Sequence, residues 1–112
     1  GVVAILGMSS KGTLTDQNYR EEATKVAQSH PNVFGGVSQN KIPNELLLFT
    51  PGINLSDSGD GKGQQYNSPE HAFTQLQTDF IIVGRGIYKS DDAEKSALTY
   101  KIAGWNAYEG SL

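Results

Sequence analysis

Four short runs of aliphatic and β-branched residues constrain the fold of this chain more than any other feature of its sequence. They are Val2–Leu6, Val33–Val37, Leu46–Phe49 and Phe80–Val83. Each run is almost continuously apolar instead of alternating between apolar and polar residues. Strands that are buried on both faces have this pattern, as in a parallel sheet covered by helices. The runs therefore predict an α/β protein built on a parallel sheet.

Helical patterns follow the first, third and fourth of these runs. The segment Asp16–His30 begins with a suitable N-cap residue, Asp16. Its apolar residues recur at helical spacing: Tyr19, Ala23, Val26 and Ala27. A second helix is predicted to begin at Ser68, because a serine N-cap is followed by proline at the first helical position.

The last segment of the chain predicts the longest helix. Asp91 and Asp92 lie at its amino end, where carboxylates favour helix formation. Its apolar residues form one stripe: Ala97, Leu98, Ile102, Trp105 and Tyr108. The order of elements is thus strand, helix, strand, strand, helix, strand, helix, which is typical of α/β folds.

The connection Ser38–Glu45 is unusual, because it has eight residues and includes Pro43. A parallel crossover usually takes about a dozen residues or more. We expect a single irregular turn in place of a helix here. On pattern alone, the four strands fit an open flavodoxin-like sheet or half of a (β/α)₈ barrel, whose whole usually needs about 250 residues.

Composition narrows the class of protein. The 112 residues suit one domain, 37% are hydrophobic and 19% are charged. The net charge of -3 and the scattered lysines and arginines argue against nucleic-acid or membrane partners. The chain has no cysteine and no apolar run near the ~20 residues of a membrane span, so we expect a cytoplasmic protein. It opens "GVVAIL" without Met, inside an expected strand, which suggests a piece of a longer chain.

Several familiar motifs are incomplete in this sequence. In "SDSGDGKGQQYNSPE", placing Gly61 sixth in a calcium loop puts Asn67 where a bidentate glutamate is required. Gly63 follows Lys62 where a phosphate loop needs Ser or Thr. "VGRGIY" lacks the third glycine of a dinucleotide fingerprint. His30 and His71 lack metal-ligand spacing, and Asn54-Leu55-Ser56 is a common triplet. We expect no metal site.

Polar residues and glycines follow the predicted strands. Ligands of parallel α/β proteins gather at the carboxyl ends of the strands, where this chain has Ser9, Pro51, Gly84 and Arg85. Arg85 lies between two glycines, so bare N–H groups and a guanidinium could together hold a phosphate. A tight turn with a solvated arginine is the alternative.

Gln64 and Tyr66 end the glycine-rich stretch "GDGKGQQY". Their side chains supply neutral hydrogen-bond donors that suit a phosphate or a ribose. Ordinary hydrogen bonding within the loop is the alternative.

The chain resembles the orotidine 5'-monophosphate decarboxylase family, in particular the decarboxylase domain of eukaryotic enzymes and of bifunctional uridine monophosphate synthase. The resemblance covers essentially the whole chain. It rests on five stretches in the family's order and spacing: "MSSKGTL", "LLLFTPGINL", "GDGKGQQYNSPE", "DFIIVGRGIY" and "YKIAGWNAY". It implies that residues 1–112 are the carboxyl-terminal half, strands five to eight, of a (β/α)₈ TIM barrel.

The resemblance also implies roles for the residues that match the family's motifs. Ser9 would bind the pyrimidine ring, and Pro51 would begin a lid loop at about residues 51–66. Gln64 and Tyr66 would reach the 5'-phosphate from that lid, while Gly84 and Arg85 would hold it from the barrel. The reaction implied is decarboxylation of orotidine 5'-monophosphate to uridine 5'-monophosphate (UMP), without a metal or organic cofactor.

The chain departs from the family at Gly7, where the family usually has an acidic residue, and in the Ser38–Glu45 connection, which is only loosely alike. The family's Lys-Asp-x-Lys-x-x-Asp catalytic set, which lies on the amino-terminal half, is absent from the sequence. We therefore expect no catalytic residue in this chain and no activity of the chain alone. We expect it to pair with the missing amino-terminal half-barrel or with a second copy, as in a homodimer. The alternatives are a non-catalytic half-barrel and a sugar-phosphate epimerase or isomerase.

Overall fold

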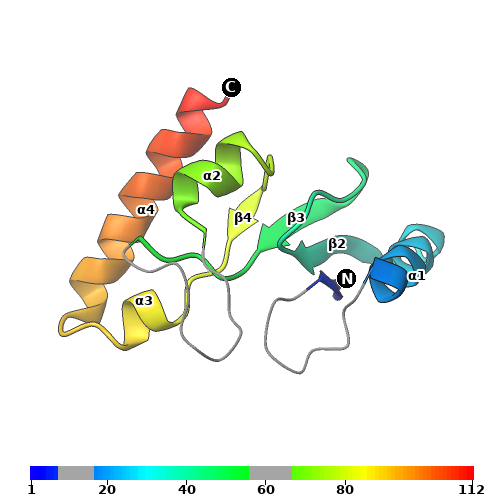
Figure 1. The fold of residues 1–112 in the computed structure, drawn as a ribbon, viewed down its shortest axis with the longest axis horizontal. Coiled ribbons are helices and arrows are strands. Elements are labelled where there is room, and N and C mark those ends of the chain that lie inside the picture. Colours follow the sequence, from blue (N-terminus) through cyan, green and yellow to red (C-terminus); the bar gives the residue numbers. More distant parts are fainter. Residues whose placement is uncertain (8–16, 56–66) are drawn as a thin grey trace.

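A computed structural model describes residues 1–7, 17–55 and 67–112 of the chain. The strands are β1 (Val2–Gly7), β2 (Val33–Ser38), β3 (Leu47–Thr50) and β4 (Phe80–Ile81). The helices are α1 (Gln17–Ser29), α2 (Pro69–Thr74), α3 (Arg85–Tyr88) and α4 (Ala93–Gly110). Figure 1 shows their arrangement.

The four strands form one parallel sheet in the order β1-β2-β3-β4. The parallel sheet predicted from the apolar runs is confirmed. Strand order follows chain order without a reversal, as in the wall of a (β/α)₈ barrel, whereas a flavodoxin-like sheet reverses its order next to the first strand. β4 is shorter than predicted, although Ile82 N still donates to Thr50 O over 2.8 Å and so continues the pairing with β3.

The β2–β3 connection contains no helix, as the sequence predicts. Leu46 N donates to Pro43 O over 3.0 Å and closes a turn. Asn40 N donates to Ser38 Oγ over 2.9 Å, which bends the chain directly after β2. This irregular turn takes the place of a crossover helix.

One apolar core lies between α1 and the first strands. Ala27 of α1 packs with Leu6 and Leu46, and Ala23 adds to the same face. Val26, predicted from its spacing to share this face, has 56% of its surface exposed. Helical spacing groups Val26 with Tyr19 and Ala23, but Ala27 lies nearer the centre of the buried face.

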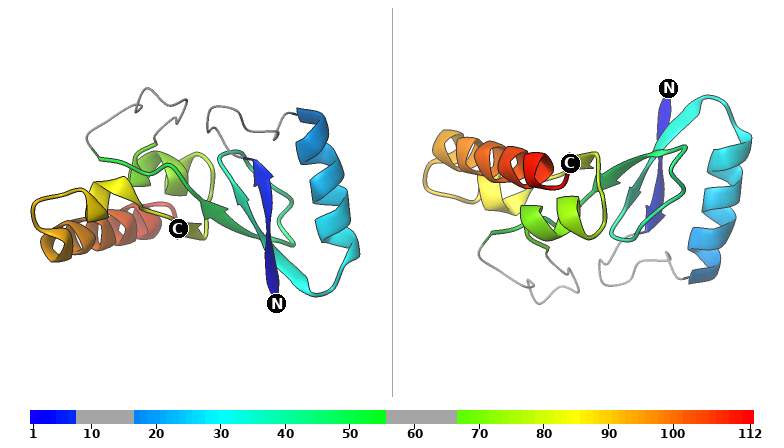
Figure 2. Two further views of the ribbon diagram at one scale, coloured as in Figure 1. Left: turned by 90° about the horizontal axis from the view of Figure 1, so that it is seen from below. Right: turned by 90° about the horizontal axis from the view of Figure 1, so that it is seen from above.

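A second core joins α2, α4 and the residues after β3. Ile53, Ala72 and Tyr100 are buried in it, with Ile81, Val83 and Ile87 packed around them. Both views of Figure 2 show α2, α3 and α4 gathered at one end of the sheet and α1 at the other. The predicted caps of α2 and α4 are confirmed, since Ser68 accepts from His71 N and Asp92 accepts from Lys95 N. Asp16, the predicted cap of the first helix, lies outside the described residues.

The face that α4 buries differs from the apolar stripe found in its sequence. Tyr100 and Gly104 are its buried residues, because a glycine lets the helix approach Ile81 and Phe73 closely. Leu98, Ile102 and Trp105 of the stripe are more than half exposed. In the part of the chain that the structure describes, no helix is both long and apolar enough to cross a bilayer.

Candidate functional site

The carboxyl ends of the strands meet at one edge, because all four strands are parallel. Pro51 follows β3 directly and is buried, and Gly84 and Arg85 follow β4. The structure thus places these three predicted site residues at the edge where parallel α/β proteins bind ligands. Ser9, Gln64 and Tyr66 lie outside the described residues, in segments 8–16 and 56–66.

The residues after Pro51 form a fixed base for segment 56–66. Gly52 has a φ of 71°, a conformation that glycine adopts without strain. Ile53 and Asn67 pair as a parallel bridge, in which Asn67 N donates to Gly52 O over 2.7 Å and Asn54 N donates to Asn67 O over 3.0 Å. Hydrogen bonds therefore join Gly52 and Asn54, which precede segment 56–66, to Asn67, which follows it.

Hydrogen bonds among Thr50, Thr78 and Leu48 fix the end of β3, directly before Pro51. Thr50 Oγ1 donates to Thr78 Oγ1 over 2.8 Å, and both threonines are buried. Thr78 Oγ1 also lies 2.9 Å from Leu48 O. Gln39 Nε2 donates to Pro51 O over 3.5 Å, so the β2–β3 connection also contacts the residue that precedes the base.

Gly84 and Arg85 lie at the beginning of α3, a single helical turn that the sequence analysis did not predict. Gly84 is its N-cap, and Gly84 O accepts from Ile87 N and Tyr88 N over 2.9 and 3.1 Å. Arg85 is partly buried and Gly84 is exposed. A tight turn, which was the alternative to a phosphate site at Arg85, leads into α3, and Arg85 is the first residue of that helix.

Tyr100 of α4 connects the base to this turn. It is 6% exposed, and its hydroxyl accepts from Leu55 N over 3.0 Å. Gly86, the residue after Arg85, lies against the same hydroxyl. No role was predicted for Tyr100 from the sequence. Its signals were its place at the start of the family stretch "YKIAGWNAY" and its position four residues before Gly104, which puts both on one face of the helix.

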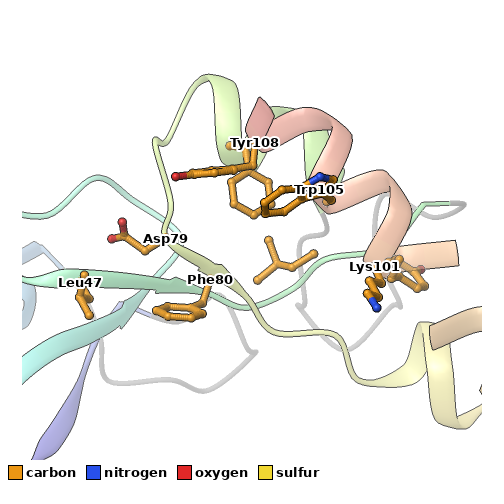
Figure 3. A pocket seen from close by; sticks show the side chains of 10 residues that line it. Leu47, Asp79, Phe80, Lys101, Trp105 and Tyr108 are labelled. Carbon is orange, nitrogen blue, oxygen red and sulfur yellow. The ribbon is translucent and has the colours of Figure 1, made fainter. Parts of the chain in front are cut away.

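A separate apolar groove of about 650 Å³ lies between β4 and α4 (Figure 3). Trp105 and Tyr108 border it from the helix, and Leu47, Asp79 and Phe80 border it from the sheet side. Those last three residues are at the amino ends of β3 and β4, away from Pro51 and Gly84. The groove therefore opens away from the candidate phosphate site, although Tyr100 lines the groove and also contacts Leu55.

A row of three phenylalanine rings extends from Phe80, which borders this groove, across β3 to β2. Phe49 and Phe80 stack with ring centroids 4.6 Å apart, and Phe34 meets Phe49 edge-on at 6.3 Å. Phe34 and Phe80 are 44% and 48% exposed. Contiguous exposed apolar surface of this kind is typical of surfaces that bind another protein, a membrane or a ligand.

The described residues include no group of three or more His, Cys, Asp or Glu side chains placed to hold a metal ion. Glu45 has a lowered pKa, chiefly because Gln28 Nε2 donates to its carboxylate over 2.6 Å. This pair joins α1 to the β2–β3 connection and lies outside the candidate site.

The sequence is similar to known decarboxylases over nearly its whole length. It is 43% identical to orotidine 5'-phosphate decarboxylase of Phycomyces blakesleeanus over 96% of this chain and 43% of that protein. It is 42% identical to uridine 5'-monophosphate synthase of Naegleria gruberi over 97% of this chain and 23% of that protein. It is 37% identical to the Schizosaccharomyces pombe decarboxylase over 100% of this chain and 44% of that protein. The chain thus spans less than half the length of these relatives.

A family model agrees with these relatives. The model of the orotidine 5'-phosphate decarboxylase / HUMPS family matches residues 1–100. The resemblance seen in the five sequence stretches is therefore confirmed. The chain belongs to the orotidine 5'-phosphate decarboxylase / HUMPS family.

Proposed function

We propose that this chain is the carboxyl-terminal half of an orotidine 5'-monophosphate decarboxylase, a cytoplasmic lyase that forms UMP and CO₂ in pyrimidine synthesis. The observation that carries the proposal is about 40% identity to decarboxylases and to uridine monophosphate synthase across nearly the whole chain. The matched part is less than half of each relative, which supports a half-barrel. Its assignment to strands five to eight rests on the family resemblance of the five sequence stretches.

The outer strands of the sheet and the apolar groove support the proposal that a second half-barrel binds this chain. β1 and β4 are the outer strands of the described sheet, and each pairs with one neighbour. An unpaired strand edge is a place where another strand adds. The groove between β4 and α4 provides apolar surface beside one of these edges (Figure 3). We assign the groove to the amino-terminal half-barrel, whose first strand would pair with β4.

The nucleotide would bind across the carboxyl edge of the sheet. Ser9 would bind the pyrimidine ring. Gln64 and Tyr66, on a lid that begins at Pro51, would bind the 5'-phosphate together with Gly84 and Arg85. A guanidinium gives two parallel, permanently charged hydrogen bonds to a phosphate. The shared contact of Leu55 and Gly86 with Tyr100 supports this arrangement, because it brings the lid base close to the Arg85 turn.

In the proposed reaction, the bond between the pyrimidine ring and the carboxylate carbon breaks. CO₂ leaves, the electron pair remains on the ring carbon, and a proton replaces the carboxylate. The Lys and Asp residues that stabilise the carbanion and protonate it would come from the amino-terminal half. The residues of this chain would grip the distant phosphate, so that binding energy far from the reacting carbon closes the lid and excludes water.

Release of CO₂ from carboxyl-labelled orotidine 5'-monophosphate tests this assignment. We expect turnover by the protein at its full natural length and none by residues 1–112 alone. Turnover by the purified 112-residue chain would contradict the division of roles. A folded full-length protein without turnover, but with activity on a sugar phosphate, would favour the epimerase or isomerase alternative. A folded full-length protein without either activity would favour a non-catalytic half-barrel.

A further inference from the structure

Tyr100 joins the second core to the backbone at Leu55. Its ring is packed in that core with Ile53 and Ala72, while its hydroxyl accepts a partly buried hydrogen bond from Leu55 N. Leu55 is the last described residue before segment 56–66, and its side chain is exposed. The Tyr100 hydroxyl therefore accepts a hydrogen bond from the base of the proposed lid.

Gly86, in the Arg85 turn, also lies against this hydroxyl. A methyl group on Gly86 would overlap the Tyr100 hydroxyl oxygen and would lie 2.9 and 3.1 Å from Tyr100 Cζ and Cε2. Only a residue without a side chain fits at this distance. The backbone next to Arg85 thus rests directly on the group that binds Leu55.

We propose that Tyr100 is a positioning residue that holds the Gly84–Arg85 turn against the backbone at Leu55, so that the guanidinium of Arg85 is placed to bind the phosphate. The inference rests on the proposed function, because it needs a phosphate that binds to Arg85. Tyr100 would not touch the nucleotide. It would act through Leu55 on one side and Gly86 on the other.

The hydroxyl, rather than the ring, carries this role. Phenylalanine would fill the same core volume but could not accept from Leu55 N, which would lose its partner in a partly buried place. The lid base could then shift relative to Arg85. Misplacement by about 1 Å is enough to weaken binding and catalysis strongly.

The test compares the dissociation constants of UMP and uridine, which differ by the phosphate, in the full-length protein. We expect Tyr100→Phe to weaken UMP about tenfold and uridine less than about twofold. Tyr19→Phe is the matched control, because it removes a tyrosine hydroxyl that donates to Ile5 O over the same 3.0 Å. The control should leave the ratio of the two dissociation constants unchanged.

The outcomes separate this inference from the proposed function. If Arg85→Ala weakens UMP selectively while Tyr100→Phe binds UMP as the wild type does, the phosphate site stands and the positioning role is wrong. An equal loss for UMP and uridine in Tyr100→Phe would also contradict the role. If Arg85→Ala retains UMP affinity, the phosphate assignment fails, and the positioning role fails with it.

Gly86→Ala provides a second variant should Tyr100→Phe fold poorly. Its methyl group must displace the Tyr100 hydroxyl, so we expect the same selective loss of UMP affinity. In a Gly86→Ala background, Tyr100→Phe should cost less than it does in the wild type, because the hydroxyl is already displaced. Wild-type UMP affinity in Gly86→Ala would overturn the inference.

Discussion

At the scale of single residues, Thr78 shows how the candidate site is supported from below. Its hydroxyl lies 2.8 Å from Thr50 Oγ1 and 2.9 Å from Leu48 O, and Thr78 is 4% exposed. Thr50 directly precedes Pro51, the first residue of the proposed lid. A buried hydroxyl pair therefore fixes the end of β3 where the site begins.

Thr78→Val should destabilise the protein because it leaves the buried Thr50 hydroxyl without this partner. We expect a loss of about 1–3 kcal/mol in the free energy of unfolding, measured by urea denaturation. Thr99→Val is the control, since its hydroxyl donates to Lys95 O on the exposed face of α4. The control should change stability by less than about 0.5 kcal/mol. Equal effects would show that the Thr50–Thr78 contact adds nothing.

The pKa of Glu45 provides a second test at this scale. The hydrogen bond from Gln28 favours the ionised carboxylate and so lowers the pKa below its usual value. The stability from this pair is therefore present above the usual carboxyl pKa and is lost as the pH falls through the lowered one. In Gln28→Ala, the Glu45 pKa should rise toward its usual value in a carbon-detected NMR titration. An unchanged pKa would mean that the contact is absent in solution.

At the scale of elements, the sequence predicts the parts whose determinants are local. The four apolar runs predicted the strands, and Ser68 and Asp92 marked the helix beginnings, because capping depends on residues within one turn. The short helix α3 gave no such signal. The Leu55–Tyr100 bond joins residues 45 positions apart, so no local pattern could reveal it.

Contacts between residues distant in sequence also explain why Val26 and the apolar stripe of α4 are exposed. Helical spacing identifies which residues share a face, but the face that is buried depends on what packs against it. For α4 the deciding residue is Gly104, which allows close packing on Phe73 and Ile81. Neighbours distant in sequence therefore decide burial.

The contact between β2 and β3 gives an element-scale prediction. A methyl group on Gly35 would lie 2.7 Å from Leu47 O and 2.8 Å from Phe49 Cε1, so Gly35→Ala must separate the strands or distort them. We expect a loss of about 1–3 kcal/mol of stability, seen as a lower Tm. Gly110→Ala, at a position with nothing within 4 Å, is the matched control and should not lower Tm. Equal Tm values for Gly35→Ala and wild type would contradict the close strand pairing.

At the scale of the whole molecule, the exposed apolar surfaces are the reason for expecting residues 1–112 to associate with a partner. The exposed rings of Phe34 and Phe80 and the groove under Trp105 leave apolar surface beside an unpaired strand edge. We therefore expect residues 1–112 by themselves to associate with a second copy at tens of micromolar.

Sedimentation velocity measures this association. Trp105→Glu should weaken it about tenfold or more, because an aromatic side chain in an apolar groove is replaced by a charge. Asn106→Glu adds the same charge at the next position of α4 and should have little effect. A wild-type chain that sediments as a monomer would contradict the expectation.

The proposed function depends on Arg85 of this chain holding the phosphate of a pyrimidine nucleotide. The most direct measurement is a calorimetric titration of the full-length protein and its Arg85→Ala variant with UMP and with uridine. We predict that the variant binds UMP about a hundredfold more weakly, because a charge-assisted bidentate contact is lost, and binds uridine as the wild type does. Unchanged UMP affinity in Arg85→Ala would contradict the account.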